Sequence, residues 1–354
     1  MSDDKTFLLE IAPIGEYFFG GERTFQSVEN DKDGNPVTNY FARSNNYPQQ
    51  TAILGMIRHV LLLLYGKLDA TPAEKEEIIG KNFSVYKDSP FGKIVSLSPL
   101  VILHNHGKNI LFPAGLDKQK YNGFKGFNLE MTQGSVYLNR HSNLVPDLNN
   151  FNYKKELRNC WQDSEMCVHE EDLFENSTRV GVHTDRSANG FYKQTFKAIK
   201  KGFSFGVWVT FAVDFLPEKL TDIVMPFGAD QGLSQLRFHT NVALPGIFTE
   251  SAVFNPTKMI LLSDAYVDND FFDAFDYGIT VSEEFRYIDS ARANFYKMDS
   301  SGFSKSSKLR LLKRGSVLYF SDFAKVKQVL SRFNSSFKRI GYNYYNFNYT
   351  RRHK

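Results

Sequence analysis

The chain has 354 residues, enough for two domains with separate cores, and its composition is that of a globular protein, 42% hydrophobic and 23% charged. The longest apolar run, residues 53–65, is interrupted by Arg58 and His59 and falls short of the ~20 apolar residues needed to cross a bilayer. The acidic start is unlike a secretion signal and two cysteines make no disulfide framework, so we expect a soluble, cytoplasmic protein with no membrane partner.

The net charge of +4 conceals an uneven distribution. Residues 301–354 hold thirteen Lys and Arg against one acid, so this segment carries +12 and the remaining 300 residues carry −8. Such asymmetry indicates a surface for a polyanion near the C-terminus. A solvated basic face without a partner is the alternative that charge alone leaves open.

Elements of the first half follow apolar patterning and breakers. We predict a strand over residues 6–14, a polar loop or irregular hairpin over 20–47, a helix over 48–64, and two strands over 93–103 and 109–113 joined by a turn at 104–108. Pro48 suits a first helical turn and Gly66 a C-terminal stop. Residues 114–176 show little periodicity and are interpreted as long loops around short elements.

Order returns in the second half. Strands are predicted over residues 178–183, 203–213, 258–262 and 316–320, and a helix over 322–333. In the segment 203–213, Phe and Val alternate with smaller or polar residues, which is the pattern of a half-buried strand. In the segment 322–333, apolar side chains recur at helical spacing with lysines off the stripe.

Two groups of strands, each with an amphipathic helix, predict an α+β fold in which helices cover one face of an antiparallel sheet. We interpret them as two ferredoxin-like domains with long loop and hairpin insertions, the first over residues 1–175 and the second over 176–354.

The first helix carries a candidate nucleic-acid contact. Thr51, Gly55 and Arg58 are four and three residues apart and share one face. A small residue beside an arginine lets a nucleic-acid backbone approach, and the guanidinium would then bind a phosphate. Alternatively, Gly55 permits tight helix–sheet packing and Arg58 pairs with a nearby carboxylate.

A second candidate follows the last helix. Lys338 and Arg339 bring charge, Gly341 permits close backbone approach and Tyr342 offers a ring, while Tyr344, Tyr345, Phe347, Tyr349, Arg351 and Arg352 extend the pattern. Aromatic residues interleaved with cations are typical of single-stranded RNA binding, where rings stack on bases. The alternative is an aromatic strand packed in the core.

The sequence gives weaker evidence for catalytic or metal sites than for nucleic-acid contacts. His104 and His106 would share one face of a strand, but they fall in the predicted turn and have no third and fourth ligand nearby, and Cys160, Cys167 and His169 lack zinc-site spacing. The acidic residues Asp264, Asp268, Asp270, Asp273 and Asp276 lack the pattern of a calcium loop and are interpreted as a solvated or protein-docking loop. No phosphate-binding loop, dinucleotide fingerprint or nucleophile elbow is present, and we expect no cofactor and no metal.

Three ordered segments resemble a known family. They are FFGGERTF (18–25) followed by SNNYPQQTAILGMIRHVLL (44–62), STRVGVHTDRSANGFYKQ (177–194), and RGSVLYF (314–320) with RIGYN (339–343). Together they resemble the third subunit of the type III-B (Cmr) CRISPR effector complex, in the RAMP superfamily. That family has an aromatic-glycine turn before a Pro-x-x-Thr-Ala-x-x-Gly-x-x-Arg helix start, which residues 48–58 match.

The resemblance implies two RAMP/RRM-like domains and a non-catalytic subunit for antiviral defence. Such a subunit would bind the repeat-derived 5′ tag of the guide RNA (crRNA), and would bridge the large polymerase/cyclase-like subunit to the backbone RAMP subunit. The residues expected to contact RNA are Thr51, Gly55, Arg58, His59, Arg179, Arg314, Lys338, Arg339, Gly341, Tyr342 and Asn343.

Two other functions remain open. RAMP folds also include metal-independent endoribonucleases that process CRISPR transcripts, and His59 or His183 would then be the general base. A purely protein-bridging subunit is the third possibility, with the basic C-terminus docked onto an acidic partner.

Overall fold

The structure is a computed structural model and has an α+β fold in which sheets predominate. It describes residues 5–20, 23–25, 29–30, 36–37, 40–85, 88–105, 107–117, 129–132, 135–138, 160–164, 166–183, 190–215, 220, 222–229, 232–249, 258–285, 298–299, 302–303 and 308–347. No helix within these ranges combines the length and apolar character needed to span a bilayer.

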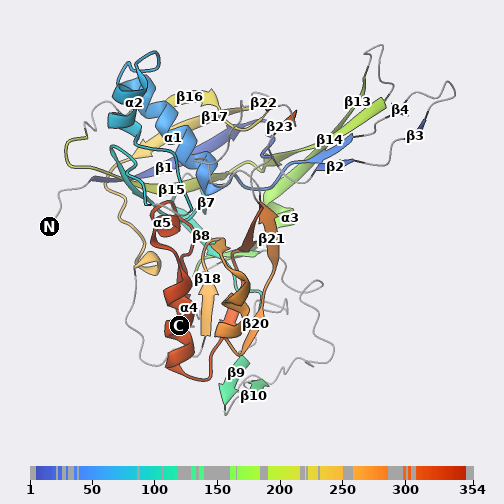
Figure 1. The fold of residues 1–354 in the computed structure, drawn as a ribbon, viewed down its shortest axis with the longest axis vertical. Helices are drawn as coiled ribbons and strands as arrows, with labels where there is room; N and C mark the ends of the chain where they lie inside the picture. The colour runs from blue at the N-terminus through green and yellow to red at the C-terminus, as the bar shows by residue number, and fades with distance from the viewer. Residues whose placement is uncertain are drawn as a thin grey trace.

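A nine-stranded sheet forms the larger body, drawn in the upper part of Figure 1. Its order is β12–β11–β8–β7–β15–β1–β17–β16, with β6 also pairing with β15. The strands are β1 (Lys5–Ile14), β6 (Ile94–Leu97), β7 (Val101–His104), β8 (Asn109–Pro113), β11 (Cys160–Gln162), β12 (Cys167–His169), β15 (Phe203–Phe211), β16 (Ile223–Pro226) and β17 (Leu233–His239).

The alternation predicted in residues 203–213 is confirmed for β15, but the strand ends at Phe211 and Val213 is exposed. Phe205, Val207 and Val209 are fully buried in one core, under the helices, whereas Trp208 belongs to a smaller cluster on the opposite face. Both faces of the sheet centre are therefore covered, and β15 lies between β1 and β7 as the predicted patterning requires.

Helices α1 (Gln50–Leu64) and α2 (Pro72–Ile79) lie over one face of this sheet (Figure 1). The predicted start at Pro48 is two residues early, because Gln49 is still extended and acts as the N-cap. Gly66 ends α1 with a φ of +63°, as predicted. We predict no helix at α2 from periodicity, although Thr71 and Glu74 form a capping box at its start.

One predicted strand is two. The segment 93–103 divides into β6 and β7 because Pro99 interrupts the ladder. Ser98 restores the lost pairing: its backbone N–H donates to the Trp208 carbonyl, and its hydroxyl accepts from the Trp208 N–H, both at 2.9 Å.

An arm of four strands projects from the larger body, at the upper right of Figure 1. Its order is β13 (Phe174–His183), β14 (Gly190–Ile199), β5 (Tyr40–Arg43) and β2 (Arg23–Phe25). The arm shows that the predicted loop 20–47 contains strands, and that the predicted strand 178–183 begins at Phe174. Strand β14 is not predicted; it pairs antiparallel with β13 along its whole length and in parallel with β5, about 150 residues away.

The smaller body, in the lower part of Figure 1, contains two short sheets. One has the order β20 (Tyr277–Ile279), β25 (Val317–Tyr319), β18 (Lys258–Leu261), β26 (Tyr345–Phe347), and the other β19 (Ala265–Tyr266), β24 (Leu309–Leu312), β21 (Ser282–Phe285). The predicted strands at 258–262 and 316–320 are confirmed as β18 and β25. Helix α4 (Phe323–Arg332) buries Val326 and Val329, and Asp322 caps it by accepting from the Lys325 N–H at 3.0 Å.

The remaining elements are short. They are α3 (Glu170–Leu173), α5 (Ser335–Arg339), η2 (Gly246–Phe248), η3 (Asn269–Ala274), and the two-stranded pairs β3 (Glu29–Asn30) with β4 (Pro36–Val37), β9 (Leu129–Thr132) with β10 (Ser135–Leu138), and β22 (Met298–Asp299) with β23 (Gly302–Phe303). The nine-stranded sheet takes strands from both sides of the boundary predicted at residues 175 and 176.

Helix α5 and the turn after it join the two bodies. Gly341 has a φ of +92°, and a Cβ there would lie 2.3 Å from the Gln50 Nε2 and 2.4 Å from the Ser98 carbonyl oxygen. Glycine is required at this position for both conformation and space. The predicted close approach at Gly341 therefore exists, but the partner is α1 and the β6–β7 connection.

We predict opposite effects of alanine at two glycines. Gly341→Ala should lower the free energy of unfolding by about 3 kcal/mol, through a left-handed φ and overpacking. Gly55→Ala should raise it by up to about 1 kcal/mol, because Gly55 is helical and exposed and a Cβ there meets nothing within 4 Å. Urea titrations followed by circular dichroism measure both, and equal effects would contradict this description of Gly341.

Candidate nucleic-acid interface

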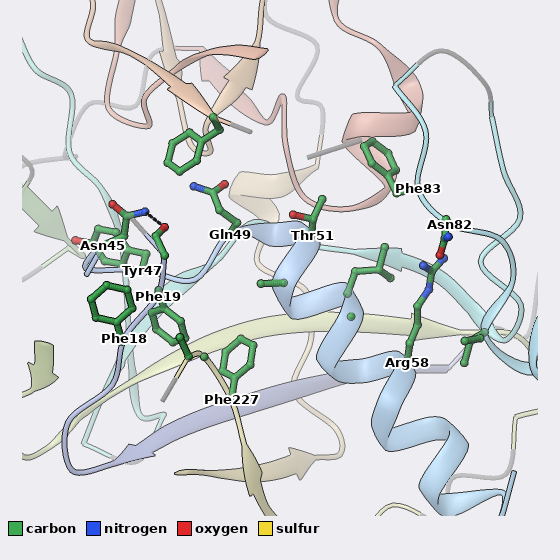
Figure 2. Close-up of a pocket in the computed structure, with 18 residues that line it drawn as sticks. Phe18, Phe19, Asn45, Tyr47, Gln49, Thr51, Arg58, Asn82, Phe83 and Phe227 are labelled. Atoms are coloured by element: carbon green, nitrogen blue, oxygen red, sulfur yellow. Dashed lines mark hydrogen bonds between the residues drawn. The ribbon is translucent and has the colours of Figure 1, made fainter. Parts of the chain in front are cut away.

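A pocket of about 490 Å³ opens beside the first half of α1 (Figure 2). It lies between that helix, the aromatic turn after β1, and the segments around Asn82 and Gly228. The lining residues are Phe18, Phe19, Gly20, Asn45, Tyr47, Gln49, Thr51, Ala52, Leu54, Gly55, Arg58, Ile79, Asn82, Phe83, Phe227, Gly228, Ala229 and Phe285. We call it the α1 pocket.

Three predicted contact residues meet in this pocket. Thr51, Gly55 and Arg58 all line it, as their spacing predicts. Because a Cβ at Gly55 would meet no atom within 4 Å, Gly55 is not there to permit tight helix–sheet packing. The glycine instead leaves the backbone of α1 open toward the pocket.

Arg58 is a buried cation without a carboxylate. It exposes 9% of its surface, and its guanidinium lies 5.4 Å from the centre of the Phe91 ring. One terminal nitrogen donates to the Lys81 carbonyl, while Nε has no hydrogen-bond partner. No ion pair to Arg58 is found in the described ranges, and burial lowers the pKa of Arg58 to about 10. Such a group gains from an anion that enters the pocket.

Rings and amides form the opposite wall, as Figure 2 shows. The Phe19 and Phe227 rings are 5.1 Å apart at their centres, and the Asn45 amide donates to the Gly20 carbonyl at 2.8 Å. Gly228, with a φ of +101°, brings its backbone close to the Phe18 carbonyl oxygen. Aromatic faces beside amide groups suit an unstacked nucleobase.

A second pocket of about 580 Å³ adjoins the first. It shares Asn45, Tyr47 and Gln49 with the α1 pocket. The full lining is Arg43, Ser44, Asn45, Asn46, Tyr47, Pro48, Gln49, Glu170, Glu171, Phe174, Asn176, Lys197, Asp264, Glu283, Lys313 and Arg314. We call it the junction pocket, because it draws residues from the arm and from both bodies.

A hydrogen-bonded chain forms the floor of the junction pocket. The Trp161 indole donates to the Tyr47 hydroxyl at 2.6 Å, and that hydroxyl donates to Glu170 at 2.5 Å. Asn46 donates to the other Glu170 oxygen at 2.7 Å. Burial raises the pKa of Glu170 and, together with the Glu170 charge, holds the pKa of Tyr47 well above its ordinary value.

Arg314, another predicted contact residue, closes this pocket from the smaller body. Its Nε lies 3.2 Å from Asp264 Oδ1, and its guanidinium lies 4.9 Å from the centre of the Tyr47 ring. Burial raises the pKa of Asp264, but the charges of Arg314 and Lys313 and the Arg314 hydrogen bonds outweigh burial and lower it to about 2. Arg314 therefore holds the smaller body against the larger one as well as facing the pocket.

The C-terminal tract is placed differently from its prediction. Tyr342 is completely buried and donates to the Gln49 side chain at 2.8 Å, so its ring offers no stacking surface. Asn343 is also completely buried, with a φ of +59°, and accepts from the Tyr266 N–H at 2.9 Å. For both residues the alternative of core packing holds, because the tract inserts between the two bodies instead of lying on them.

The two cations of the tract are half-buried. Arg339 pairs with Asp88 at 2.8 Å and lies 4.6 Å from the centre of the Phe91 ring. Lys338 lies 5.5 Å from the centre of the Tyr344 ring. Neither residue lines either pocket.

The other two predicted contact residues lie elsewhere. His59 is exposed on α1 outside both pockets. Arg179 is exposed on β13, pairs with Glu16 at 2.7 Å and covers the Phe196 ring at 4.2 Å. Neither residue lines the α1 pocket together with Arg58.

Internal ion pairs neutralise much of the basic C-terminal segment. Arg332 pairs with Asp268, Lys325 with Asp276, and Lys313 and Arg314 with Asp264. Three members of the acidic stretch interpreted as a solvated or docking loop are thus partners of that segment. Residues 348–354 lie outside the described ranges.

The weaker metal candidates gain nothing. His104 stacks on Phe203 at 4.5 Å, and His106 is outside the described residues. Cys160 Sγ lies 3.2 Å from His169 Nδ1 on a β-hairpin, and both cysteines are free thiols. Within the described ranges, no three His, Cys, Asp or Glu side chains are grouped as metal ligands.

Several pocket residues are not predicted from the sequence. Arg43 and Lys197 lie on strands β5 and β14, which the sequence does not predict. Gln49 is predicted to be helical, because the helix is predicted to begin at Pro48. The alternation of Lys193, Thr195 and Lys197 is the one local signal that could have revealed a cationic strand face.

Comparisons with known proteins identify the class. A family model for CRISPR-associated proteins matches residues 9–268 of the chain. The protein belongs to that family, Cas_Cmr3. No curated protein matches the sequence.

Solved structures give weaker likenesses. A chain in the cryo-EM structure of the type III-B Cmr-beta bound to cognate target RNA is 14% identical, covers 95% of both chains and gives a TM-score of 0.49. A chain of the Csm3–Csm4 subcomplex of the type III-A CRISPR-Cas interference complex is 12% identical, with coverage of 88% and 92% and a TM-score of 0.37.

The Asp264 ion pairs make stability depend on acid pH. The pKa of Asp264 falls from 3.8 to about 2 on folding, and each unit is worth about 1.4 kcal/mol, so the carboxylate contributes about 2 kcal/mol above pH 4. This contribution should disappear as the pH falls from about 4 to about 2, where the folded carboxyl takes its proton. Asp264→Asn should remove that pH dependence and cost about 3–5 kcal/mol at neutral pH, since two cations lose their partner. Urea titrations at several pH values test both predictions. If the free energy of unfolding of Asp264→Asn fell between pH 4 and pH 2 as that of the wild type does, Asp264 would not be the cause of the pH dependence.

Proposed function

We propose that the protein is a non-catalytic guide-RNA-binding subunit of a type III-B CRISPR effector complex. It would hold the repeat-derived 5′ tag of the crRNA, with the α1 pocket as the contact site. Family membership supports a CRISPR role, and the chemistry of the pocket supports RNA.

Arg58 carries this proposal. Its charge is buried beside an open pocket and has no carboxylate partner in the described part of the chain. Leaving a guanidinium in that state costs stability, so a protein gains from it only when an anion binds. The adjacent Gly55 leaves room for a phosphate to reach the helix.

The rest of the α1 pocket suits a base. A nucleotide with its phosphate at Arg58 can place its base toward the Phe19 and Phe227 rings, where stacking is tolerant of sequence. The side-chain amides of Asn45, Gln49 and Asn82 can read hydrogen-bonding edges. One wall therefore binds the backbone and the other the base.

The proposal includes the wider assembly. The chain would contain two ferredoxin-like RAMP domains and would work in the cytoplasm, although the nine-stranded sheet crosses the boundary predicted near residue 175. The subunit would bridge the large polymerase/cyclase-like subunit to the backbone RAMP subunit. The alternative of a processing endoribonuclease gains no support from His59, which lies outside both pockets, and the His183 side chain is outside the described residues.

RNA that accompanies the protein tests the proposal most directly. The tagged chain is purified from its host and the 5′ ends of the bound RNA are sequenced. A uniform repeat-derived 5′ end on many spacers is expected. Random cellular RNA, or none, would overturn the guide-tag function.

A substitution tests the site. Arg58→Gln should weaken guide-RNA binding about tenfold or more, because one charged hydrogen bond is lost. The slope of log affinity against log salt concentration should fall by roughly 0.7. Folding stability should stay the same or rise, because removing a buried charge without a carboxylate partner offsets the loss of the hydrogen bond to the Lys81 carbonyl. Arg332→Gln is the matched control, since Arg332 pairs with Asp268 far from the pocket. Equal RNA affinity for the two variants would refute a phosphate contact at Arg58.

A further inference from the structure

Two cations that form no ion pair with any described residue line the junction pocket together. Arg43, on β5, is exposed, and Lys197, on β14, is half-buried; both line the pocket. The strands are parallel neighbours, and Arg43 lies opposite Thr195, two residues from Lys197 and on the same face. Neither forms an ion pair in the described ranges, unlike Lys313 and Arg314 across the pocket.

The two charges act on one another. Burial and the Arg43 charge lower the pKa of Lys197, and the Glu170 charge opposes them only partly. Like charges side by side cost free energy unless a counter-ion lies between them. The arrangement is thus incomplete without an anion.

The carboxylates of the pocket are already engaged elsewhere. Asp264 binds Arg314 and Lys313, and Glu283 pairs with Lys313 at 2.6 Å. Glu170 accepts from Tyr47 and Asn46, and burial favours its neutral form. Glu171 is the remaining acid and is exposed on α3. The acidic residues of the pocket therefore leave the positive charges of Arg43 and Lys197 largely uncompensated.

Arg314, which also lines the pocket, has a hydrogen-bond donor to spare. The Nη1 of Arg314 is buried and has no hydrogen-bond partner, although Nε and Nη2 are directed at Asp264. The guanidinium also lies 4.9 Å and 5.7 Å from the centres of the Tyr47 and Trp161 rings, which fixes its plane. An oxygen atom entering the pocket would satisfy this nitrogen.

The same charge continues along the arm. Lys193, Thr195 and Lys197 alternate on one face of β14, and their partners on β13 are Val180, Thr178 and Asn176. Lys193 is exposed. Among the described residues of β5, β13 and β14, this face carries three cations and no acid.

We propose that the junction pocket and this face of the arm bind the sugar–phosphate backbone of single-stranded RNA, with one phosphate at Arg43 and Lys197 and a neighbouring one toward Lys193. The inference rests on the proposed function, because both pockets share Asn45, Tyr47 and Gln49 and one strand can pass from one to the other. Threonine and asparagine side chains between the cations supply uncharged donors for phosphate and ribose oxygens. The α1 pocket reads a nucleotide, and the arm holds the strand that leaves it.

A double substitution tests the site on the full chain. Arg43→Gln with Lys197→Gln removes two charges and keeps side-chain length. Binding of a fluorescein-labelled oligouridylate of about twenty nucleotides is titrated over about 0.1–1 M KCl, and the log–log slope should fall by about 0.7, because the variant loses the one phosphate contact that Arg43 and Lys197 share. The ratio of wild-type to variant affinity should therefore fall about fivefold across that range of salt. Because the change relieves repulsion, the variant should unfold at the same or a higher urea concentration.

The controls separate this inference from the proposed function. Lys108→Gln with Lys201→Gln removes two exposed lysines that line neither pocket, and should leave the slope unchanged. If Arg43→Gln/Lys197→Gln behaves like that control while Arg58→Gln weakens binding, the arm site is refuted and the α1 pocket stands. If all variants bind RNA as the wild type does, both the arm site and the α1 pocket are refuted as RNA-binding sites. Competition by polyglutamate as effective as that by RNA would overturn the assignment to RNA.

Discussion

The turn at Gly341–Asn343 is the contact on which the arrangement of the molecule depends. Gly341 accepts from the Gln50 side chain at 3.2 Å, and Tyr342 donates to Gln49, so both bind the start of α1. Asn343 donates its N–H to the Asp264 carbonyl at 3.1 Å. One buried turn therefore joins the larger body to the smaller one. Its two positive φ angles explain why glycine and asparagine occupy it.

The turn also determines the geometry of both pockets. It fixes the start of α1, the helix from which Thr51, Gly55 and Arg58 line the α1 pocket, and it holds Asp264, which orients Arg314 in the junction pocket. A side chain that must meet a phosphate is most effective when its supports are rigid. The C-terminal tract thus contributes to the site through position, while its own rings are buried.

The elements predicted from the sequence are those whose apolar pattern is complete within a short stretch of residues. The apolar alternation of β15 and the stripes of α1 and α4 are visible in short windows, and so are the three residues that α1 directs into its pocket. The juxtaposition of Arg43 and Lys197 depends on a parallel pairing of β14 with β5 across about 150 residues, which no short window contains. The sequence does not distinguish stacking from packing for Tyr342, because a tyrosine between cations and a glycine suits both environments; its complete burial in the structure does.

Charge counted along the sequence and charge available to a ligand differ for a physical reason. The basic C-terminal segment folds against acids at 264–284, and in the described ranges its cations are largely engaged in ion pairs or stacked on rings. Arg43, Arg58 and Lys197 belong to the part of the chain whose net charge is −8, yet none of them forms an ion pair with a carboxylate among the described residues. A ligand responds to the local field of unpaired groups in pockets of low dielectric, where screening is weak. The anion-binding surface therefore follows the unpaired cations, at the junction of α1 and the arm, and not the segment where basic residues are most numerous.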